Sequence, residues 1–240
     1  MEQMDKNAML NAYMTEQNKR LEIVLKHMAA GVKFVDMGNA YIDESVEIGE
    51  GTVIGPCVTL EGSTKIGKNC VIRQNTRITD SELADGVEIE NSVIVESSIG
   101  ENTKVGPFAY MRPGSKVGAN CKVGDFVEIK NSTFGDGTKA AHLTYIGDSD
   151  LGKNVNLGCG VVFVNFDGRD KYRSTVGDNA FIGCNSNLVS PVNIGDGAYI
   201  AAGSTVTEDV EGDELYIARA RGTKKPGWVS AKGMLIRKKK

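Results

Sequence analysis

Three side chains in the middle of the chain have types and spacing suited to anion binding and proton transfer. Arg112 and Lys130 each follow an apolar residue, Met111 or Ile129, at the same place in a repeating pattern, and His142 lies a short distance beyond. A guanidinium and an ammonium group are suitable phosphate ligands. A neutral imidazole near physiological pH can take a proton from a nucleophile. The set therefore suggests a phosphate-bearing substrate whose nucleophile loses a proton.

A six-residue repeat positions these side chains. Apolar residues recur every sixth position from Ile42 to Ile78, and again from Val176 to Val206. This period fits neither a helix nor a simply alternating strand. It predicts a hexapeptide-repeat solenoid, an all-β parallel β-helix in which three hexapeptides make one coil of the prism. The usual rule for parallel crossovers favours right-handed coils.

The repeat gives the spacing between the two cations a physical meaning. At eighteen residues per coil, Arg112 and Lys130 lie one above the other, about one strand spacing of 4.8 Å apart. Like charges at this distance repel unless an anion lies between them. A bound phosphate is one candidate for that anion. The alternative is that Asp125 or Glu128 neutralises the two cations on a solvated face.

The pattern also divides the chain. We expect an N-terminal helix and lead-in over residues 1–41, because this segment contains a long stretch of helical composition. The β-helix should cover residues 42–210, with a loop extruded at 164–175, where the repeat is interrupted. Residues 211–240 should form a C-terminal cap and basic tail, because they are too basic and irregular to continue the repeat.

Composition excludes several classes of protein. The net charge is −3, which disfavours a general nucleic-acid binder. There is neither an apolar run long enough to cross a bilayer nor a signal peptide, so we expect a cytoplasmic protein. We expect no metal site, because the only other histidine, His27, falls in the predicted helix and there is no C-x-x-C pair. The odd set of cysteines predicts no disulfide framework: Cys57, Cys70, Cys121, Cys159 and Cys184.

A prism with flat faces has no pocket of its own, whereas small-molecule sites are concave. The site should therefore lie between prisms or beside the extruded loop. A homo-oligomer follows from this requirement, and three prisms packed side by side would create three equivalent grooves.

Several ordered segments resemble the C-terminal acetyltransferase domain of the bacterial bifunctional N-acetylglucosamine-1-phosphate uridyltransferase and glucosamine-1-phosphate acetyltransferase. The resemblance is dense from Gly106 to Trp228 and looser over most of the remainder. The segments that carry it are Arg112-Pro113-Gly114, 123–130 (VGDFVEIK), 142–148 (HLTYIGD), 154–158 (NVNLG), 165–168 (NFDG) and 200–203 (IAAG).

This resemblance implies a left-handed β-helix that assembles as a homotrimer with sites between subunits. It implies that His142 is the catalytic base as the glucosamine amine attacks the thioester of acetyl-CoA, the co-substrate. It assigns sugar-phosphate binding to Arg112, Lys130, Tyr145, Asn156 and Lys171. It assigns acetyl-CoA binding to Cys159, Asn165, Phe166, Cys184, Ala202 and Arg219.

The chain departs from the family pattern in two ways. Phe166 stands where Tyr is common and Cys184 where Ser is common, so we expect contacts with the acetyl donor to differ in detail. No Gly-rich nucleotide-binding segment precedes the helix, so we expect neither uridyl transfer nor its magnesium ion. The product would be N-acetylglucosamine 1-phosphate, a precursor of UDP-N-acetylglucosamine and of the peptidoglycan cell wall that maintains cell shape.

Three alternatives stay open from the sequence. Cys159 or Cys184 could carry a covalent acyl group, although neither has a histidine or lysine close by in sequence. The chain could instead be a non-catalytic trimeric scaffold or regulatory subunit for a nucleotidyltransferase. It could also acetylate a different amino sugar, because the same residues would permit it.

Overall fold

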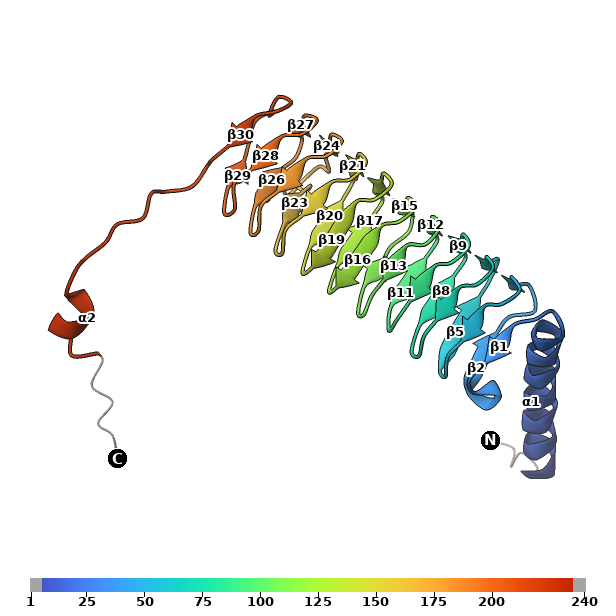
Figure 1. Ribbon diagram of the computed structural model, residues 1–240. Helices are drawn as coiled ribbons and strands as arrows, with labels where there is room; N and C mark the ends of the chain where they lie inside the picture. Colours follow the sequence, from blue (N-terminus) through green and yellow to red (C-terminus); the bar gives the residue numbers. More distant parts are fainter. Residues whose placement is uncertain (1–5, 235–240) are drawn as a thin grey trace.

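Each repeat unit of the chain forms one short strand and one corner, and successive coils stack into a three-sided prism (Figure 1). The structure is a computed structural model that describes residues 6–234. Its strands form three parallel sheets, here called sheets A, B and C, one on each side of the prism. The predicted parallel β-helix is therefore confirmed.

Along the chain, each coil begins with a strand of sheet A, which is followed by a strand of sheet B. The strands of sheet A are β1 (Lys33–Phe34), β4 (Val53–Ile54), β7 (Val71–Ile72), β10 (Glu88–Ile89), β13 (Lys104–Val105), β16 (Lys122–Asp125), β19 (Lys139–His142), β22 (Asn156–Leu157), β25 (Phe181–Ile182), β28 (Tyr199–Ile200) and β30 (Leu215–Tyr216). The first and last of these strands show that the stack begins before Ile42 and continues past residue 210.

Sheets B and C complete each coil. The strands of sheet B are β2 (Ala40–Ile42), β5 (Val58–Glu61), β8 (Arg77–Thr79), β11 (Val93–Val95), β14 (Tyr110–Met111), β17 (Glu128–Lys130), β20 (Tyr145–Gly147), β23 (Val162–Val164), β26 (Asn187–Val189) and β29 (Thr205–Val206). Those of sheet C are β3 (Glu47–Ile48), β6 (Lys65–Ile66), β9 (Glu82–Leu83), β12 (Ser98–Ile99), β15 (Lys116–Val117), β18 (Thr133–Phe134), β21 (Ser149–Leu151), β24 (Ser174–Val176) and β27 (Asn193–Ile194).

The core consists of the residues that set the six-residue period. Ile54, Ile72 and Ile89 stack on successive strands of sheet A and are at most 1% exposed. Each coil buries its apolar residues against the coils above and below, so the core is continuous along the prism. A glycine often follows the inward residue, because neighbouring coils approach closely there. A β-carbon at Gly100 would lie 2.5 Å from the carbonyl carbon of Gly118.

A single helix covers the first coil. This helix, α1 (Lys6–Ala29), buries Val24 and His27 against the prism end (Figure 1). Burial, and then the nearby charge of Lys26, lowers the pKa of His27, as expected for a structural imidazole. A short 3-10 helix, η1 (Met37–Asn39), leads into β2. Within residues 6–234, no helix combines the length and apolarity needed to cross a bilayer.

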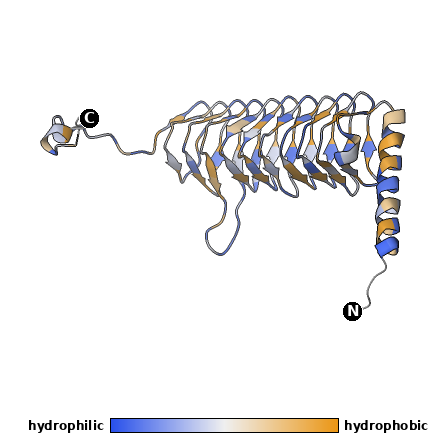
Figure 2. Ribbon diagram, turned by 90° about the horizontal axis from the view of Figure 1, so that it is seen from below, coloured by the Kyte–Doolittle hydropathy of each residue, from blue (hydrophilic) through white to orange (hydrophobic). Residues whose placement is uncertain are grey.

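Two segments leave the prism. A hairpin projects between β23 and β24 (Figure 2), where the sequence predicts a loop. After β30 the chain runs away from the last coil to the short helix α2 (Trp228–Ala231) (Figure 1). The basic residues predicted in the tail at Arg237–Lys240 lie outside the described residues.

Candidate functional site

His142 and Asp125 form a hydrogen-bonded pair at the edge between sheets A and B. They occupy the last positions of β19 and β16, which are in register, and His142 Nδ1 lies 2.6 Å from Asp125 Oδ1. This hydrogen bond is the main reason why the pKa of Asp125 is lowered. An ionised carboxylate has no proton to donate, so it can only accept the hydrogen bond. We infer that Nδ1–H donates this hydrogen bond to Asp125 Oδ1 and keeps its proton. The neutral imidazole then has a free lone pair on Nε2, the atom that a general base uses.

Sequence reasoning found His142 but assigned Asp125 differently. It considered Asp125 as a counter-ion for Arg112 and Lys130, whereas the structure places it beside the imidazole. Asp125 lies seventeen residues before His142, which is close to the length of one coil. This coil is one residue shorter than the ideal eighteen, so equal spacing could not reveal the pairing.

Arg112 and Lys130 lie on successive coils of sheet B, as the repeat predicts. Met111 pairs with Ile129, and the residue that follows each of them is one of the two cations. However, each cation has its own carboxylate. Arg112 Nη1 lies 2.9 Å from Glu128 Oε1, and Lys130 Nζ lies 2.9 Å from Asp148 Oδ2. The cations therefore do not require a phosphate to offset their repulsion, and Glu128 neutralises Arg112 as the alternative proposed.

Asp148 is the centre of a network that the sequence did not reveal. Its side chain is only 10% exposed, and its two oxygens accept hydrogen bonds from three residues. Lys130 Nζ donates to both oxygens, at 3.1 and 2.9 Å. Asn131 Nδ2 donates at 2.7 Å and Asn165 Nδ2 at 2.5 Å. Burial opposes ionisation of Asp148, but these donors outweigh it and the pKa of the carboxyl is lowered.

The root of the hairpin is fixed to the same corner of the prism. Tyr172 N donates to Asn165 O at 2.9 Å, which closes the hairpin at its base. Arg173 binds both carboxylate oxygens of Asp150 and also donates to Asn131 O at 2.9 Å. The hairpin is thus anchored on both sides, and Phe166 projects from it with 51% of its surface exposed.

The residues predicted to bind a sugar phosphate do not all share one side of this chain. Arg112, Lys130 and Tyr145 gather on the outer face of sheet B and its edge with sheet C. Asn156 belongs to sheet A, where it pairs with Lys139. Lys171 belongs to the hairpin and forms an antiparallel bridge with Phe166.

The residues predicted to contact acetyl-CoA lie in three places. Cys159, Cys184 and Ala202 follow inward residues of sheet A that are in register, so they occupy equivalent places on consecutive coils. Leu157 pairs with Ala140, and Cys159 is therefore one coil beyond His142. Asn165 and Phe166 lie at the hairpin, and Arg219 follows the last strand of sheet A. His142 and Cys159, which are seventeen residues apart in sequence, are thus at neighbouring positions on adjacent coils.

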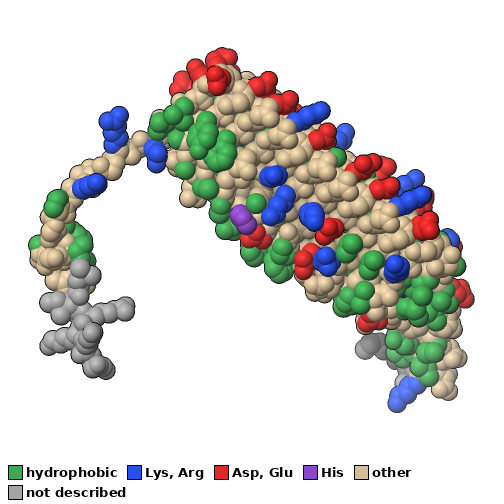
Figure 3. Space-filling model, in the orientation of Figure 1, with side chains coloured by type: hydrophobic (Ala, Val, Ile, Leu, Met, Phe, Trp, Pro, Cys, Tyr) green, Lys and Arg blue, Asp and Glu red, His purple; other side chains and the backbone are tan. Residues whose placement is uncertain are grey.

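An exposed apolar ridge runs beside His142. Phe108, Phe126 and Leu143 occupy the same corner on successive coils, and each is more than half exposed. The two Phe rings stack with centroids 5.4 Å apart. All three residues have positive φ, a conformation that costs an ordinary residue roughly 1–2 kcal/mol. Figure 3 shows apolar side chains around the histidine on this edge.

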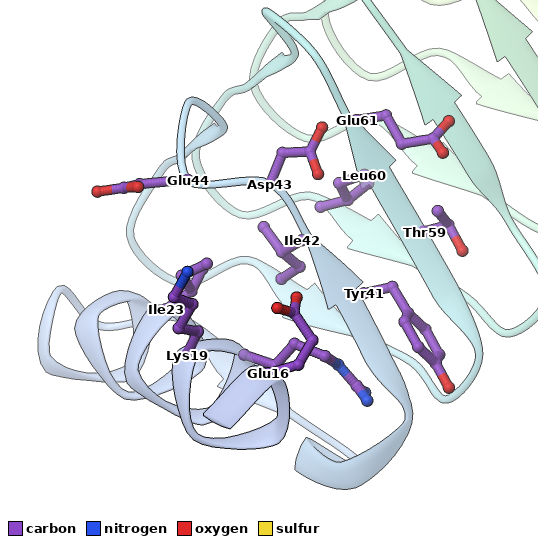
Figure 4. A pocket seen from close by; sticks show the side chains of 11 residues that line it. Glu16, Lys19, Ile23, Tyr41, Ile42, Asp43, Glu44, Thr59, Leu60 and Glu61 are labelled. Carbon is purple, nitrogen blue, oxygen red and sulfur yellow. The ribbon is translucent and has the colours of Figure 1, made fainter. Parts of the chain in front are cut away.

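A cavity of about 600 Å³ lies elsewhere, between α1 and the first coils (Figure 4). Its walls include the ring of Tyr41, over which the Arg20 guanidinium lies at 3.9 Å. Arg20 also donates to the carbonyl oxygens of Gly38 and Ala40. These contacts hold α1 on the prism. Figure 2 shows that the hairpin projects near the other end of the prism from α1.

Comparisons with known proteins agree with the repeat and with the motifs. The family model "Bacterial transferase hexapeptide (six repeats)" matches residues 96–131 and 173–208, and "GMPPB C-terminal domain" matches residues 37–113. Bifunctional protein GlmU of Acetivibrio thermocellus is 56% identical over 92% of this chain and 48% of its own length. The Clostridioides difficile protein of the same name is 52% identical over 96% of this chain and 50% of its own.

The chain thus spans about half the length of the curated relatives it matches. Among solved structures, a UDP-N-acetylglucosamine acyltransferase from Campylobacter jejuni is 20% identical, with a TM-score of 0.48. The alignment covers 78% of this chain and 72% of that one.

Replacing His142 with Ala should raise the pKa of Asp125 toward that of an ordinary Asp, because the main donor to its carboxylate is removed. A pH titration of the carboxyl carbon by NMR measures this. A carboxyl group whose pKa is lower in the folded than in the unfolded protein stabilises the fold at pH values above its unfolded pKa. This stabilisation is lost as the pH falls through the folded pKa. Stability of the parent should therefore fall more steeply in acid than that of the variant.

The control for this titration is Asp209, whose pKa is lowered by hydrogen bonds from Asn193 and should not change in the variant. An Asp125 pKa that is the same in both proteins would contradict the hydrogen-bonded pair.

Replacing Asp148 with Ala should lower the free energy of unfolding by about 3 kcal/mol, because a mostly buried ammonium and two amides lose their partner. Adding Lys130→Met should recover part of this loss, since no unpaired cation remains. A double-mutant cycle by chemical denaturation measures both effects. The exposed pair Lys65 and Glu47 is the matched control, where Glu47→Ala should change stability by less than about 1 kcal/mol. If Asp148→Ala and the double variant lost the same free energy of unfolding, the unpaired ammonium of Lys130 would not be the cause of the loss.

Proposed function

The chain belongs to the hexapeptide-repeat family and matches about half of the bifunctional GlmU proteins, and from this relationship we propose that it is a glucosamine-1-phosphate N-acetyltransferase. The observation that carries the proposal is the pair of His142 and Asp125, beside a face that presents Arg112, Lys130 and Tyr145. Acetyl-CoA is the co-substrate in this proposal. The activity proposed is confined to acetyl transfer.

The proposed reaction is direct attack of the sugar amine on the acetyl thioester. The amine must be neutral to attack, and it gives up a proton as its bond to the acetyl carbon forms. Nε2 of His142 takes that proton, while Asp125 holds the ring through Nδ1 and stabilises the imidazolium. The carbon–sulfur bond then breaks, and the CoA thiolate leaves with the electron pair and is protonated by His142 or water.

The acceptor side follows from the paired cations. A phosphate dianion bound to Arg112 and Lys130 would share these groups with Glu128 and Asp148 rather than meet bare charges. The carboxylates hold the two cations in place before the substrate arrives, which reduces the ordering cost of binding. Because the four side chains together carry no net charge, a bound phosphate has to compete with Glu128 and Asp148 for the two cations.

The donor side uses the coils beyond His142. We assign acetyl-CoA contacts to Cys159, Cys184 and Ala202 on consecutive coils, to Asn165 and Phe166 at the hairpin, and to Arg219 after the last strand. Cys159 is one coil from His142. The absence of a histidine nearby in sequence is therefore no longer an argument against an acyl-cysteine intermediate. Direct transfer remains our proposal, because it needs one base and no second acyl step.

We also propose that the site is completed by a second copy of this chain, within a homotrimer. Two observations support it: Asn156 and Tyr145 lie on different sides of one prism, and the ridge of Phe108, Phe126 and Leu143 is exposed and strained. Burying large apolar residues against a partner would offset the cost of their left-handed conformation. A cytoplasmic location and a role in UDP-N-acetylglucosamine and cell-wall precursor synthesis are part of the same proposal.

The first test measures thiol release from acetyl-CoA on addition of glucosamine 1-phosphate. The parent should release thiol, and His142→Ala should lose about 10² or more in rate, because positioned general bases contribute about 10² to 10⁴. Lys116→Ala, on the outer face of sheet C, is the control and should leave the rate unchanged. Absence of release from a folded parent would favour the scaffold alternative, and release with other amino sugars only would identify a different acceptor.

The second test concerns assembly. Phe126→Glu should convert the trimer to smaller species in sedimentation experiments, because it places a charge at the centre of the stacked ridge. Val35→Glu, at an exposed position on the first coil, should leave the sedimentation of the parent unchanged. A parent that sediments as a monomer, or a Phe126→Glu variant that remains a trimer, would refute the role of the ridge.

A further inference from the structure

Two cysteines distant in sequence occupy neighbouring places on the prism. Leu157 pairs with Ile182, and Cys159 and Cys184 each come two residues later. The backbone bond from Asn185 N to Cys159 O, at 2.8 Å, continues the same register past the strands. The hairpin that lengthens this coil accounts for their separation along the chain, so no short motif marks the pair.

The spacing of these two positions suits a covalent bond between them. Neighbouring parallel strands lie about 4.8 Å apart, and disulfides join residues whose Cα atoms are about 4.4–6.8 Å apart. The sulfur of Cys184 already leans toward the earlier coil. A β-carbon built on Gly158 would lie 2.9 Å from Cys184 Sγ, and Gly158 directly precedes Cys159.

The other cysteines provide a contrast within the same chain. Cys70 and Cys121 are buried, and their thiols lie 3.2 and 3.3 Å from backbone carbonyl oxygens of the next coil. Cys57 is exposed, but the equivalent place on the next coil is occupied by Asn75. Cys184 is exposed and Cys159 is half-buried. The described residues therefore combine accessibility with a thiol neighbour in register only at Cys159 and Cys184.

We propose that Cys159 and Cys184 are a redox-sensitive pair that closes to a disulfide when the protein meets hydrogen peroxide. One thiolate attacks the peroxide oxygen, which breaks the O–O bond and forms a sulfenic acid while hydroxide leaves and becomes water. The second thiol then attacks the sulfenic sulfur and displaces hydroxide as a second water. Two thiols lose two electrons and two protons, and one peroxide is reduced to two waters.

The bond would act at the candidate site. It would tie together two adjacent coils, next to the coil that contains His142, and it would remove both thiols from the surface assigned to acetyl-CoA. Closure should therefore block the donor while leaving the folded prism intact. This consequence rests on the proposed acetyltransferase function, whereas formation of the disulfide does not.

Peptide mapping of the full chain tests the bond itself. Hydrogen peroxide is added to the reduced protein, free thiols are alkylated, and the protein is digested with trypsin without reduction. Trypsin cuts at Arg169, Lys171 and Arg173, between the two cysteines, so the disulfide should link the peptides 154–169 and 174–219. Cys57 is the internal control and should be alkylated or oxidised without joining either peptide. Oxidation of Cys184 to a sulfinic acid without this link would overturn the proposal.

Activity measurements separate the bond from its consequence. Peroxide should remove most of the thiol-release activity of the parent, and dithiothreitol should restore it. Because Cys184 is assigned to the donor site, each variant is compared with its own untreated rate, and Cys184→Ser should lose no fraction of that rate with peroxide. A linked protein that keeps full activity would refute the switch. A reduced parent without activity would refute the proposed function and leave the mapped disulfide standing.

Discussion

The structure depends on one constraint, the parallel hydrogen bonding of each coil to the next. Backbone N–H groups of one coil donate to carbonyl groups of its neighbour along the stack, from β1 to β30. This pairing fixes which residues are neighbours, because a residue at one place in a coil contacts the residue at the equivalent place in the next. Most of the candidate groupings are such ladders between coils, and the hairpin that carries Asn165, Phe166 and Lys171 is the exception.

Stacking of equivalent positions on successive coils can place like charges next to each other, as with Arg112 and Lys130. Their repulsion then has to be offset by nearby opposite charges. The structure does this by placing a carboxylate beside each of the two cations that are candidates for phosphate binding. Arg112 has Glu128, and Lys130 has Asp148, so the candidate phosphate site is neutral before it binds anything. The same stacking places Asp125 on His142, where a carboxylate favours the tautomer that a general base requires. The stacking of coils thus produces both the ion pairs of the two cations and the hydrogen bond that orients the imidazole.

The places where the regular repeat fails are the places where the surface becomes chemically distinctive. The hairpin after β23 extends a coil, adds Phe166 and Lys171 to the surface, and is tied back through Asn165 to Asp148. At the neighbouring edge, large apolar residues replace the Asn or Gly that most corners use for positive φ, as at Phe126 and Leu143. A smooth solenoid is stable but featureless, so its function has to come from these departures.

The pattern of the sequence by itself predicted the architecture and the candidates Arg112, Lys130 and His142, whereas the other candidate residues came from the family resemblance. A six-residue apolar period can bury its residues only in a stacked three-sided coil, which is why the β-helix and the stacking of Arg112 above Lys130 were predictable. His142 was identified by its type and by its place in the repeat. These inferences need only local pattern, because inward and outward positions alternate within a short strand.

The tertiary structure decided the partners. Residues paired in register are seventeen positions apart at Asp125 and His142, eighteen at Met111 and Ile129, and twenty-five where the hairpin is inserted, at Leu151 and Val176. Each shortened corner or inserted loop shifts the register of everything after it. The neighbours of His142, Asp148 and Cys159 therefore follow from accumulated coil lengths, which only the hydrogen-bonded stack defines.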